Sequence, residues 1–323
     1  MKPMRSAILA AILLCSTSSY ALAEIKVMAS IKPVHSLVAA IMEGVGTPSL
    51  IVQGAGSPHT YSLKPSQADE LQNADVVFWV GHELEAFLEK PIETIATKAV
   101  AVSLIDTKGI TVLPPRETGS FEPHDHDAEG EPEAEAAGEA GKEHAHDHGE
   151  EVDAHIWLDP QNALLMAAEI EQALAKADPA NAAAYAANAK KLKDNIAALE
   201  TDLKTILEPT KGKGFIVFHD AYQYFETRFG VSVLGSITTS PEVIPGAERI
   251  SEMRAKVTSL KAACVFAEPN FEPKLVNTIV EGTPAKIGTL DPEAAGINEG
   301  PALYGEMMRG IATSIRDCIA QAS

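Results

Sequence analysis

The amino-acid sequence predicts an α/β fold with two lobes, each containing a mainly parallel sheet of about four strands flanked by helices. Two observations support this fold class: short apolar runs occur in two sets of four, and one long amphipathic stretch separates the sets. The runs are continuously apolar, as expected for parallel strands that helices cover on both faces. The 323 residues are enough for two domains of ordinary size.

Residues 1–23 have the pattern of a signal peptide that is removed on export. Lys2 and Arg5 make a basic start, a short apolar core follows, and Ala21–Ala23 is the small-x-small pattern that precedes a cleavage site. The apolar core is too short to span a bilayer. We therefore expect an exported mature protein that begins at Glu24 and is not inserted in the membrane.

The strands of both lobes alternate with helical stretches, an arrangement that is typical of parallel sheets. In the first lobe, residues 24–177, we expect strands at 25–30, 48–53, 75–80 and 99–104. In the second lobe, residues 209–323, we expect strands at 214–219, 231–235, 263–268 and 285–290.

Residues 115–151 differ in composition from the rest of the first lobe. They are rich in Glu, Ala, Gly, Asp and His, contain Phe121 as their one aromatic residue, and show no periodicity. A segment of this composition can bury too little apolar surface to offset the conformational entropy that it would lose on folding. We therefore expect a disordered insertion. It contains His124, His126, His144, His146 and His148. We interpret these five as an accessory, low-affinity metal collector or sensor, because a coil loses entropy for every ligand it recruits; the alternative is a solvated linker.

Residues 178–208 are expected to form the helix that links the lobes. Asp178 is a suitable N-cap, and Pro179 stands at the first helical position, where its missing N–H costs nothing. Apolar residues then recur at spacings of four and three from Tyr185 to Ile206 and form one stripe. Roughly 29 helical residues at about 1.5 Å each make a rod of about 43 Å, which predicts limited hinge opening.

The acidic character of the chain is concentrated in the insertion. The formal net charge is −19, and residues 117–153 contain 14 acidic residues and one lysine. The remainder is only mildly acidic. Nucleic acid and anionic membrane are therefore poor candidate partners.

Cys264 and Cys318 are the two cysteines that remain once the leader is removed. In the oxidising compartment that export implies, two cysteines favour a single disulfide over two unpaired thiols. Such a bridge closes a loop of about 55 residues and stabilises the fold by roughly 4 kcal/mol.

Three histidines occupy equivalent positions beside the predicted elements. His219 ends the strand at 214–219, His59 lies in the loop after the strand at 48–53, and His155 precedes a helix. Ligands of open α/β domains bind beyond the carboxyl ends of the strands. Each histidine alone is more simply a hydrogen-bonded loop residue, but three together in an exported protein favour a shared metal.

Asp291 follows the strand at 285–290 and stands at the same carboxyl end, although capping of the next turn, before Pro292, is the simpler explanation for this residue taken alone. Three imidazoles with one carboxylate or water suit tetrahedral Zn²⁺, whereas manganese prefers more oxygen. His35 and His82 also follow predicted strands, and each begins a predicted helix. We expect these two to line the cleft or to support the ligands.

Six stretches of the sequence, with the acidic insertion just before the third, form an ordered set of motifs: "HTYSLKPSQADELQNADVVFWVG", "EAFLEKP", "HIWLDP", "GKGFIVFHDAYQYFE", "CVFAEPNFEP" and "GTLDP". With this set the chain resembles the zinc-uptake, ZnuA-type members of the metal-binding ABC-transporter solute-binding proteins over essentially the whole mature length. The resemblance implies two lobes joined by a rigid helix, with a metal site in the cleft between them.

The resemblance also implies a ligand set. By motif, His59, His155 and His219 are the implied metal ligands, and Asp291 occupies the position of a fourth, carboxylate ligand in manganese-type relatives. The paired cysteines match the zinc-type pattern. Some zinc members carry an acid directly before the first ligand histidine, but Pro58 occupies that position here and has no side-chain ligand atom. The fourth ligand is therefore expected to be Asp291 or water.

The expected function is capture of Zn²⁺ in the periplasm and its delivery to an ABC-type permease driven by an ATPase, by a monomer that is not an enzyme. A manganese or iron carrier of the same architecture is the alternative, although Tyr222 and Tyr224 are interpreted as packing residues and not as iron ligands. A zinc hydrolase would need a general base, for which Glu268 is the obvious candidate, but no HExxH or nucleophile motif is present. No anchoring feature supports an adhesin.

Overall fold

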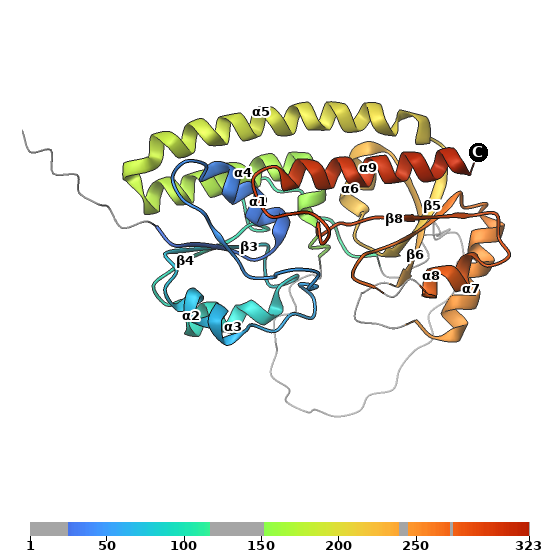
Figure 1. The fold of residues 1–323 in the computed structure, drawn as a ribbon, viewed down its shortest axis with the longest axis horizontal. Helices are drawn as coiled ribbons and strands as arrows, with labels where there is room; N and C mark the ends of the chain where they lie inside the picture. Colours follow the sequence, from blue (N-terminus) through green and yellow to red (C-terminus); the bar gives the residue numbers. More distant parts are fainter. Residues whose placement is uncertain (1–24, 117–151, 239–244, 272–273, 323) are drawn as a thin grey trace, which may run out of the picture.

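The computed structural model describes residues 25–116, 152–238, 245–271 and 274–322. They contain two four-stranded sheets, in the strand orders β2-β1-β3-β4 and β6-β5-β7-β8, and every pairing is parallel (Figure 1). The predicted α/β fold class with two parallel sheets is confirmed. The expected leader and residues 117–151 of the expected insertion lie outside the described residues. Within the described ranges, no helix has the length and apolar character needed to cross a membrane.

The elements alternate along the chain as βα units. The strands are β1 (Val27–Ala29), β2 (Ser49–Leu50), β3 (Val76–Trp79), β4 (Val100–Ser103), β5 (Gly214–His219), β6 (Ser232–Thr238), β7 (Cys264–Ala267) and β8 (Lys286–Thr289). The α-helices are α1 (Lys32–Ile41), α2 (Pro65–Gln72), α3 (Ala86–Thr94), α4 (Pro160–Ala177), α5 (Ala182–Leu207), α6 (Gln223–Phe229), α7 (Ala247–Ser259), α8 (Lys274–Val280) and α9 (Leu303–Gln321).

Each predicted strand overlaps one of the eight strands, but the prediction that helices cover all of them on both faces is wrong for two. β4 and β8 lie at the edges of their sheets, and Val100 and Ile287 on them are 50% and 45% exposed. A continuous apolar run therefore identified a parallel strand without distinguishing an edge strand from a central one.

Helix α5 is shorter at its start than the sequence predicts. A 3₁₀ turn over Pro179–Asn181 precedes it, and Asp178 ends α4 instead of capping α5. The Asp178 carboxylate accepts hydrogen bonds from the side chains of Asn181, at 2.7 Å, and Tyr185, at 2.8 Å. α5 runs along one side of the molecule past both sheets and packs against α1, α4 and α9 (Figure 1).

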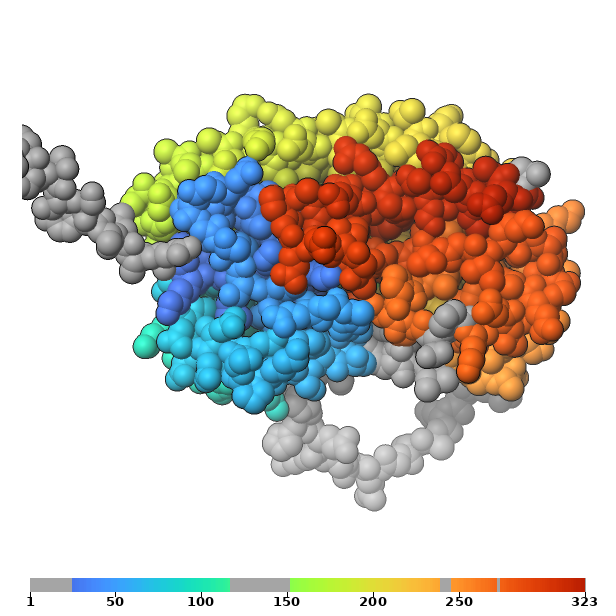
Figure 2. All heavy atoms as spheres, in the orientation of Figure 1, coloured from blue at the N-terminus to red at the C-terminus, as the bar shows by residue number. Residues whose placement is uncertain are grey.

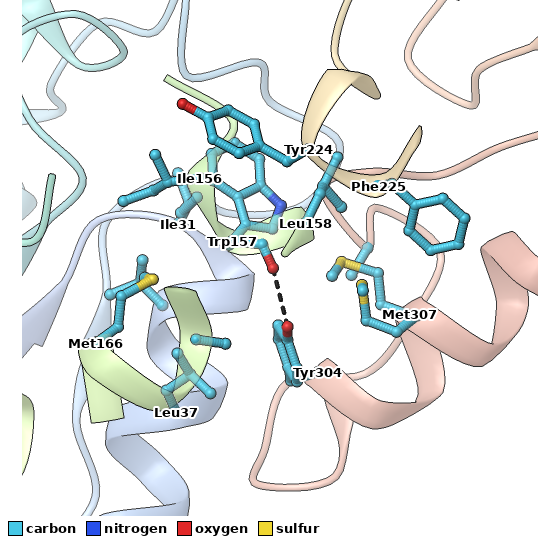
Figure 3. Close-up of a cluster of buried hydrophobic side chains, with 14 of the residues drawn as sticks. Ile31, Leu37, Ile156, Trp157, Leu158, Met166, Tyr224, Phe225, Tyr304 and Met307 are labelled. Carbon is cyan, nitrogen blue, oxygen red and sulfur yellow. Dashed lines mark hydrogen bonds between the residues drawn. The ribbon is translucent and has the colours of Figure 1, made fainter. Parts of the chain in front are cut away.

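The last helix, α9, connects the two halves of the molecule. It packs against α5, β8 and α1, and in the space-filling view the red C-terminal segment lies against blue residues of the first lobe (Figure 2). The Tyr304 hydroxyl donates to the carbonyl of Trp157 at 2.9 Å, inside a buried cluster built from both halves (Figure 3). One hydrophobic core thus runs through both halves, which restricts their relative motion.

Lys32 adds a polar connection between the halves. It lies in the first turn of α1 and is 7% exposed, and its ammonium donates to the carbonyls of Ala294, Ala295 and Ile297 at 3.0–3.1 Å. These carbonyls belong to the loop after β8. Three charge-assisted hydrogen bonds tie that loop to the first lobe.

The expected disulfide is present. Cys264 in β7 and Cys318 in α9 are bonded, and both are buried. The bridge holds the C-terminal helix to the second sheet.

A buried carboxyl group closes the turn after β3. Glu85 is fully buried, and its Oε2 accepts hydrogen bonds from the backbone N–H groups of Val80 and Gly81, both at 3.0 Å. Burial raises the pKa of Glu85 from 4.5 to about 7. The folded protein therefore keeps this proton at pH values at which the unfolded chain has lost it.

We expect a Glu85→Gln variant to be more stable than the unmodified protein at pH 8 and equally stable at pH 4. The neutral carboxyl stabilises the fold fully below pH 4.5, and this contribution, about 3 kcal/mol, is lost as the pH rises through 7. Glutamine stays neutral and keeps an acceptor oxygen. Urea unfolding at both pH values measures the difference in the free energy of unfolding between the two proteins. If the variant were less stable than the unmodified protein at pH 8, the raised pKa of Glu85 would be contradicted.

Candidate metal centre

Three segments each bring one histidine to the site, and two of these histidines stand at the carboxyl ends of strands. His219 is the last residue of β5, His59 lies in the loop after β2, and His155 directly precedes the 3₁₀ turn Ile156–Leu158. That turn leads into α4, whose N-terminus is capped by Asp159 through a 2.8 Å hydrogen bond from the backbone N–H of Gln161.

The three imidazoles converge. One ring nitrogen of each of His59, His155 and His219 lies within 4.8 Å of the other two, and His155 Nε2 is 3.4 Å from His219 Nε2. The ring centroids are 5.3–6.2 Å apart. His155 and His219 are buried, and His59 is partly buried. The three histidines that the sequence singles out therefore lie close to one another.

Two carboxylates orient the buried pair. Asp153 Oδ1 accepts from His155 Nδ1 at 2.7 Å, and Glu268 Oε2 accepts from His219 Nδ1 at 2.7 Å. With each proton on Nδ1, the Nε2 lone pairs of the two rings face one another. A cation between the rings would relieve this repulsion, and carboxylate–histidine pairs of this kind are common behind metal ligands.

Burial controls the protonation of the centre. Loss of water, followed by the neighbouring imidazoles of His155 and His219, lowers the pKa of His59 to about 3. His59 is therefore neutral near pH 7, the form that binds a metal. Burial raises the pKa of Glu268 to about 8, and a cation bound to His219 would favour its ionised form.

A cavity of about 130 Å³ opens onto the histidines. Besides His59 and His155, its lining includes three acidic residues, Glu83, Asp153 and Asp220, and one arginine, Arg116. The guanidinium of Arg116 pairs with Asp220 at 3.4 Å and also with Glu226. Acidic walls favour the entry of a cation.

The two ends of the acidic insertion meet at this cavity. Arg116 and Val152, which flank residues 117–151, both line it. The five predicted accessory histidines, His124, His126, His144, His146 and His148, lie outside the described residues.

Asp291 is not part of the converging group. Its carboxylate accepts hydrogen bonds from the backbone N–H groups of Ala295, at 2.8 Å, and Gly296, at 3.0 Å. Both oxygens thus stabilise the turn after β8, which is the capping role that the sequence left open. In this conformation, no oxygen of Asp291 joins the three imidazole nitrogens that lie within 4.8 Å of one another.

The two remaining described histidines lie away from the converging group. His35 is buried in α1, with its Nε2 3.0 Å from the carbonyl of Pro48. His82 is exposed and pairs with Glu89 at 3.1 Å. Neither lines the cavity, in contrast to their expected place in the cleft.

Sequence analysis missed several supporting residues. Tyr222 and Tyr224 do more than pack: the Tyr222 hydroxyl donates to Glu268 at 3.3 Å, and the Tyr224 hydroxyl donates to the carbonyl of Asp153 at 2.6 Å. From the sequence, Glu268 is only a candidate general base, and no role is predicted for Asp153. An acid two residues before His155 was the available signal for Asp153.

The chain matches a family of known proteins over most of its length. Residues 27–318 match the family described as "Zinc-uptake complex component A periplasmic". Proteins named "High-affinity zinc uptake system protein ZnuA" are 49% identical in Brucella suis, over 91% of this chain and 92% of that protein, and 39% identical in Yersinia pestis, over 92% and 91%.

Solved structures share the fold. "Crystal structure of ZnuA" superposes with a TM-score of 0.74 at 23% identity and covers 91% of this chain and 98% of that one. A manganese-bound periplasmic metal binding protein from Candidatus Liberibacter asiaticus superposes with a TM-score of 0.71 at 20% identity, over 91% and 99%.

Proposed function

The chain belongs to the family of periplasmic zinc-uptake components, and from this premise we propose that it captures Zn²⁺ with His59, His155 and His219 and delivers it to an ABC-type membrane permease. The zinc ion is cargo, and the permease works with an ATPase. In this proposal the protein acts as a monomeric carrier and not as an enzyme. Glu268, the candidate base of a hydrolase, is engaged by His219 and Tyr222, which supports an orienting role.

The convergence of the three imidazoles carries this proposal. Their ring nitrogens lie within 4.8 Å of one another, so one cation can reach all three with small side-chain shifts. Three neutral nitrogen donors form the borderline-soft set that Zn²⁺ accepts in tetrahedral sites.

The fourth ligand is proposed to be Asp291 or a water molecule. Both carboxylate oxygens of Asp291 are hydrogen-bonded within their own turn, which favours water in this conformation. The cavity beside His59 and His155 has room for a water molecule.

A manganese or iron carrier is the second candidate function. Its support is the fold shared with manganese-bound and nickel-bound binding proteins. Nitrogen donors favour zinc over manganese, because manganese prefers oxygen ligands. Competition between the two ions for one protein sample separates the candidates, and equal affinity would count against zinc as the cargo.

Three further expectations complete the proposal. Residues 1–23 are a cleaved leader, and residues 115–151 form an accessory metal collector. Residues 24–177 and 209–323 are the lobes, with residues 178–208 between them. The two separate sheets support this division, while α9 packs on both lobes.

Zinc titration of a chain lacking residues 118–151 tests the function. We expect one tight site to remain, because the three converging histidines lie outside the deleted segment. Competition with a chromophoric chelator measures the affinity, and the full-length chain is the control, in which weaker sites should add to the tight one. Loss of all tight binding on deletion would refute the assignment of the centre.

A further inference from the structure

Three consecutive residues at the start of α6 contact the groups behind the histidines. The Tyr222 hydroxyl donates to Glu268 Oε1 at 3.3 Å, Gln223 Nε2 donates to Asp153 Oδ2 at 3.2 Å, and the Tyr224 hydroxyl donates to the carbonyl of Asp153 at 2.6 Å. This segment begins three residues after His219. A single helix start in the second lobe thus reaches both carboxylates that orient the buried imidazoles.

The Asp153 carboxylate is held from two sides. Its Oδ1 accepts from the backbone N–H of His155 at 3.0 Å and from His155 Nδ1 at 2.7 Å, while its Oδ2 accepts from Gln223. Asp153 is 7% exposed, so little water is present to replace the amide donor. Without Gln223 the carboxylate could rotate about its Cβ–Cγ bond, and the ring of His155 would follow.

We propose that Gln223 is a positioning residue, which holds the Asp153 carboxylate and through it aims His155 Nε2 at His219 Nε2. The inference rests on the proposed function, because it assumes that these nitrogens hold the zinc ion. A ligand pair that is oriented before the metal arrives binds it more tightly, since less rotational freedom is lost on binding. α6 therefore contributes to affinity without touching the ion.

Gln223 has a second partner, which gives the competing explanation. Its Nε2 also donates to the carbonyl of Pro114 at 3.0 Å, so a substitution could act through the segment before the insertion. Exchanging the amide of Gln223 and the carboxylate of Asp153 between the two positions separates the contact with Asp153 from the contact with Pro114. In the pair Gln223→Glu with Asp153→Asn, the new amide can donate to the new carboxylate, while the contact to Pro114 stays broken.

The test compares zinc affinities of full-length variants by chelator competition. We expect Gln223→Glu to weaken binding about 10-fold and Asp153→Asn about 10- to 100-fold, as for other partners of metal-bound histidines. The double variant should bind at least about fivefold more tightly than the product of the two losses predicts. Thr227→Ala, an exposed change on the same helix, is the matched control: it removes a hydrogen bond to the backbone carbonyl of Gln223 at 2.8 Å but leaves the Gln223 amide intact, so it should bind like the unmodified chain.

Two additional measurements separate orientation from folding. Gln223→Met keeps the size of the side chain and removes the donor, so it should weaken zinc binding without lowering the melting temperature of the metal-free protein. The visible spectrum of the Co²⁺-loaded protein should change in Gln223→Glu and stay unchanged in Thr227→Ala. Unmodified affinity in both Gln223 variants, or strictly multiplicative losses in the double variant, would overturn the inference. Absence of a tight site in the unmodified chain would instead refute the proposed function.

Discussion

Replacement of His155 by alanine is expected to weaken zinc binding by about a thousandfold or more, and the same loss is expected for His59→Ala and His219→Ala. A single outer partner of a ligand is worth about 10- to 100-fold, and removal of the ligand itself should cost more. In His155→Ala the Asp153 carboxylate also loses its imidazole partner and stays buried. Chelator competition at fixed pH measures each affinity.

The chain offers matched controls for this experiment. His82→Ala removes an exposed histidine that pairs with Glu89, so zinc affinity should not change. Asp291→Ala tests the fourth ligand, and a loss below about 10-fold would support water over the carboxylate. A His59, His155 or His219 variant that keeps an affinity within 10-fold of the unmodified chain, with an unchanged fold by circular dichroism, would remove that residue from the ligand set.

Loss of the disulfide is expected to lower the free energy of unfolding by about 4 kcal/mol. The bond between Cys264 and Cys318 joins residues 54 positions apart, and the chain-entropy model gives about this value for a loop of that length. The bond also holds α9, which packs on both lobes, so its loss should loosen the connection between them. Urea unfolding of the Cys264→Ala/Cys318→Ala variant measures the effect.

Reductant provides the control for the disulfide prediction. Reduction should lower the urea midpoint of the unmodified chain and leave the double alanine variant unchanged. Zinc affinity should change much less than stability, because neither cysteine lines the cavity. An unmodified chain whose midpoint is insensitive to a strong reductant would contradict the prediction.

Much of the fold could be predicted because its signals are local. Eight apolar runs predicted eight strands, and the stripe from Tyr185 onward predicted the long helix. The start of that helix was not predicted correctly. Asp178 ends α4, and its carboxylate accepts hydrogen bonds from the side chains of Asn181 and Tyr185 instead of capping α5. Edge strands were missed because exposure of Val100 or Ile287 depends on neighbours that are distant in sequence.

The candidate ligands could be predicted because the carboxyl ends of parallel strands collect binding residues, and His59 and His219 both follow strands. Their partners could not be predicted in the same way. Glu268 lies 49 residues from His219, and Gln223 lies 70 residues from Asp153. No spacing rule connects positions so far apart.

The sequence by itself determined which segments are strands and helices and which histidines are available as ligands, because these depend on periodicity and on position beside an element. Only the tertiary structure decided that Glu268 orients His219 and that Gln223 reaches the carboxylate of Asp153. The physical reason is that a hydrogen bond needs donor and acceptor within about 3 Å. Packing of the two lobes through α5, α9 and their shared core creates that proximity.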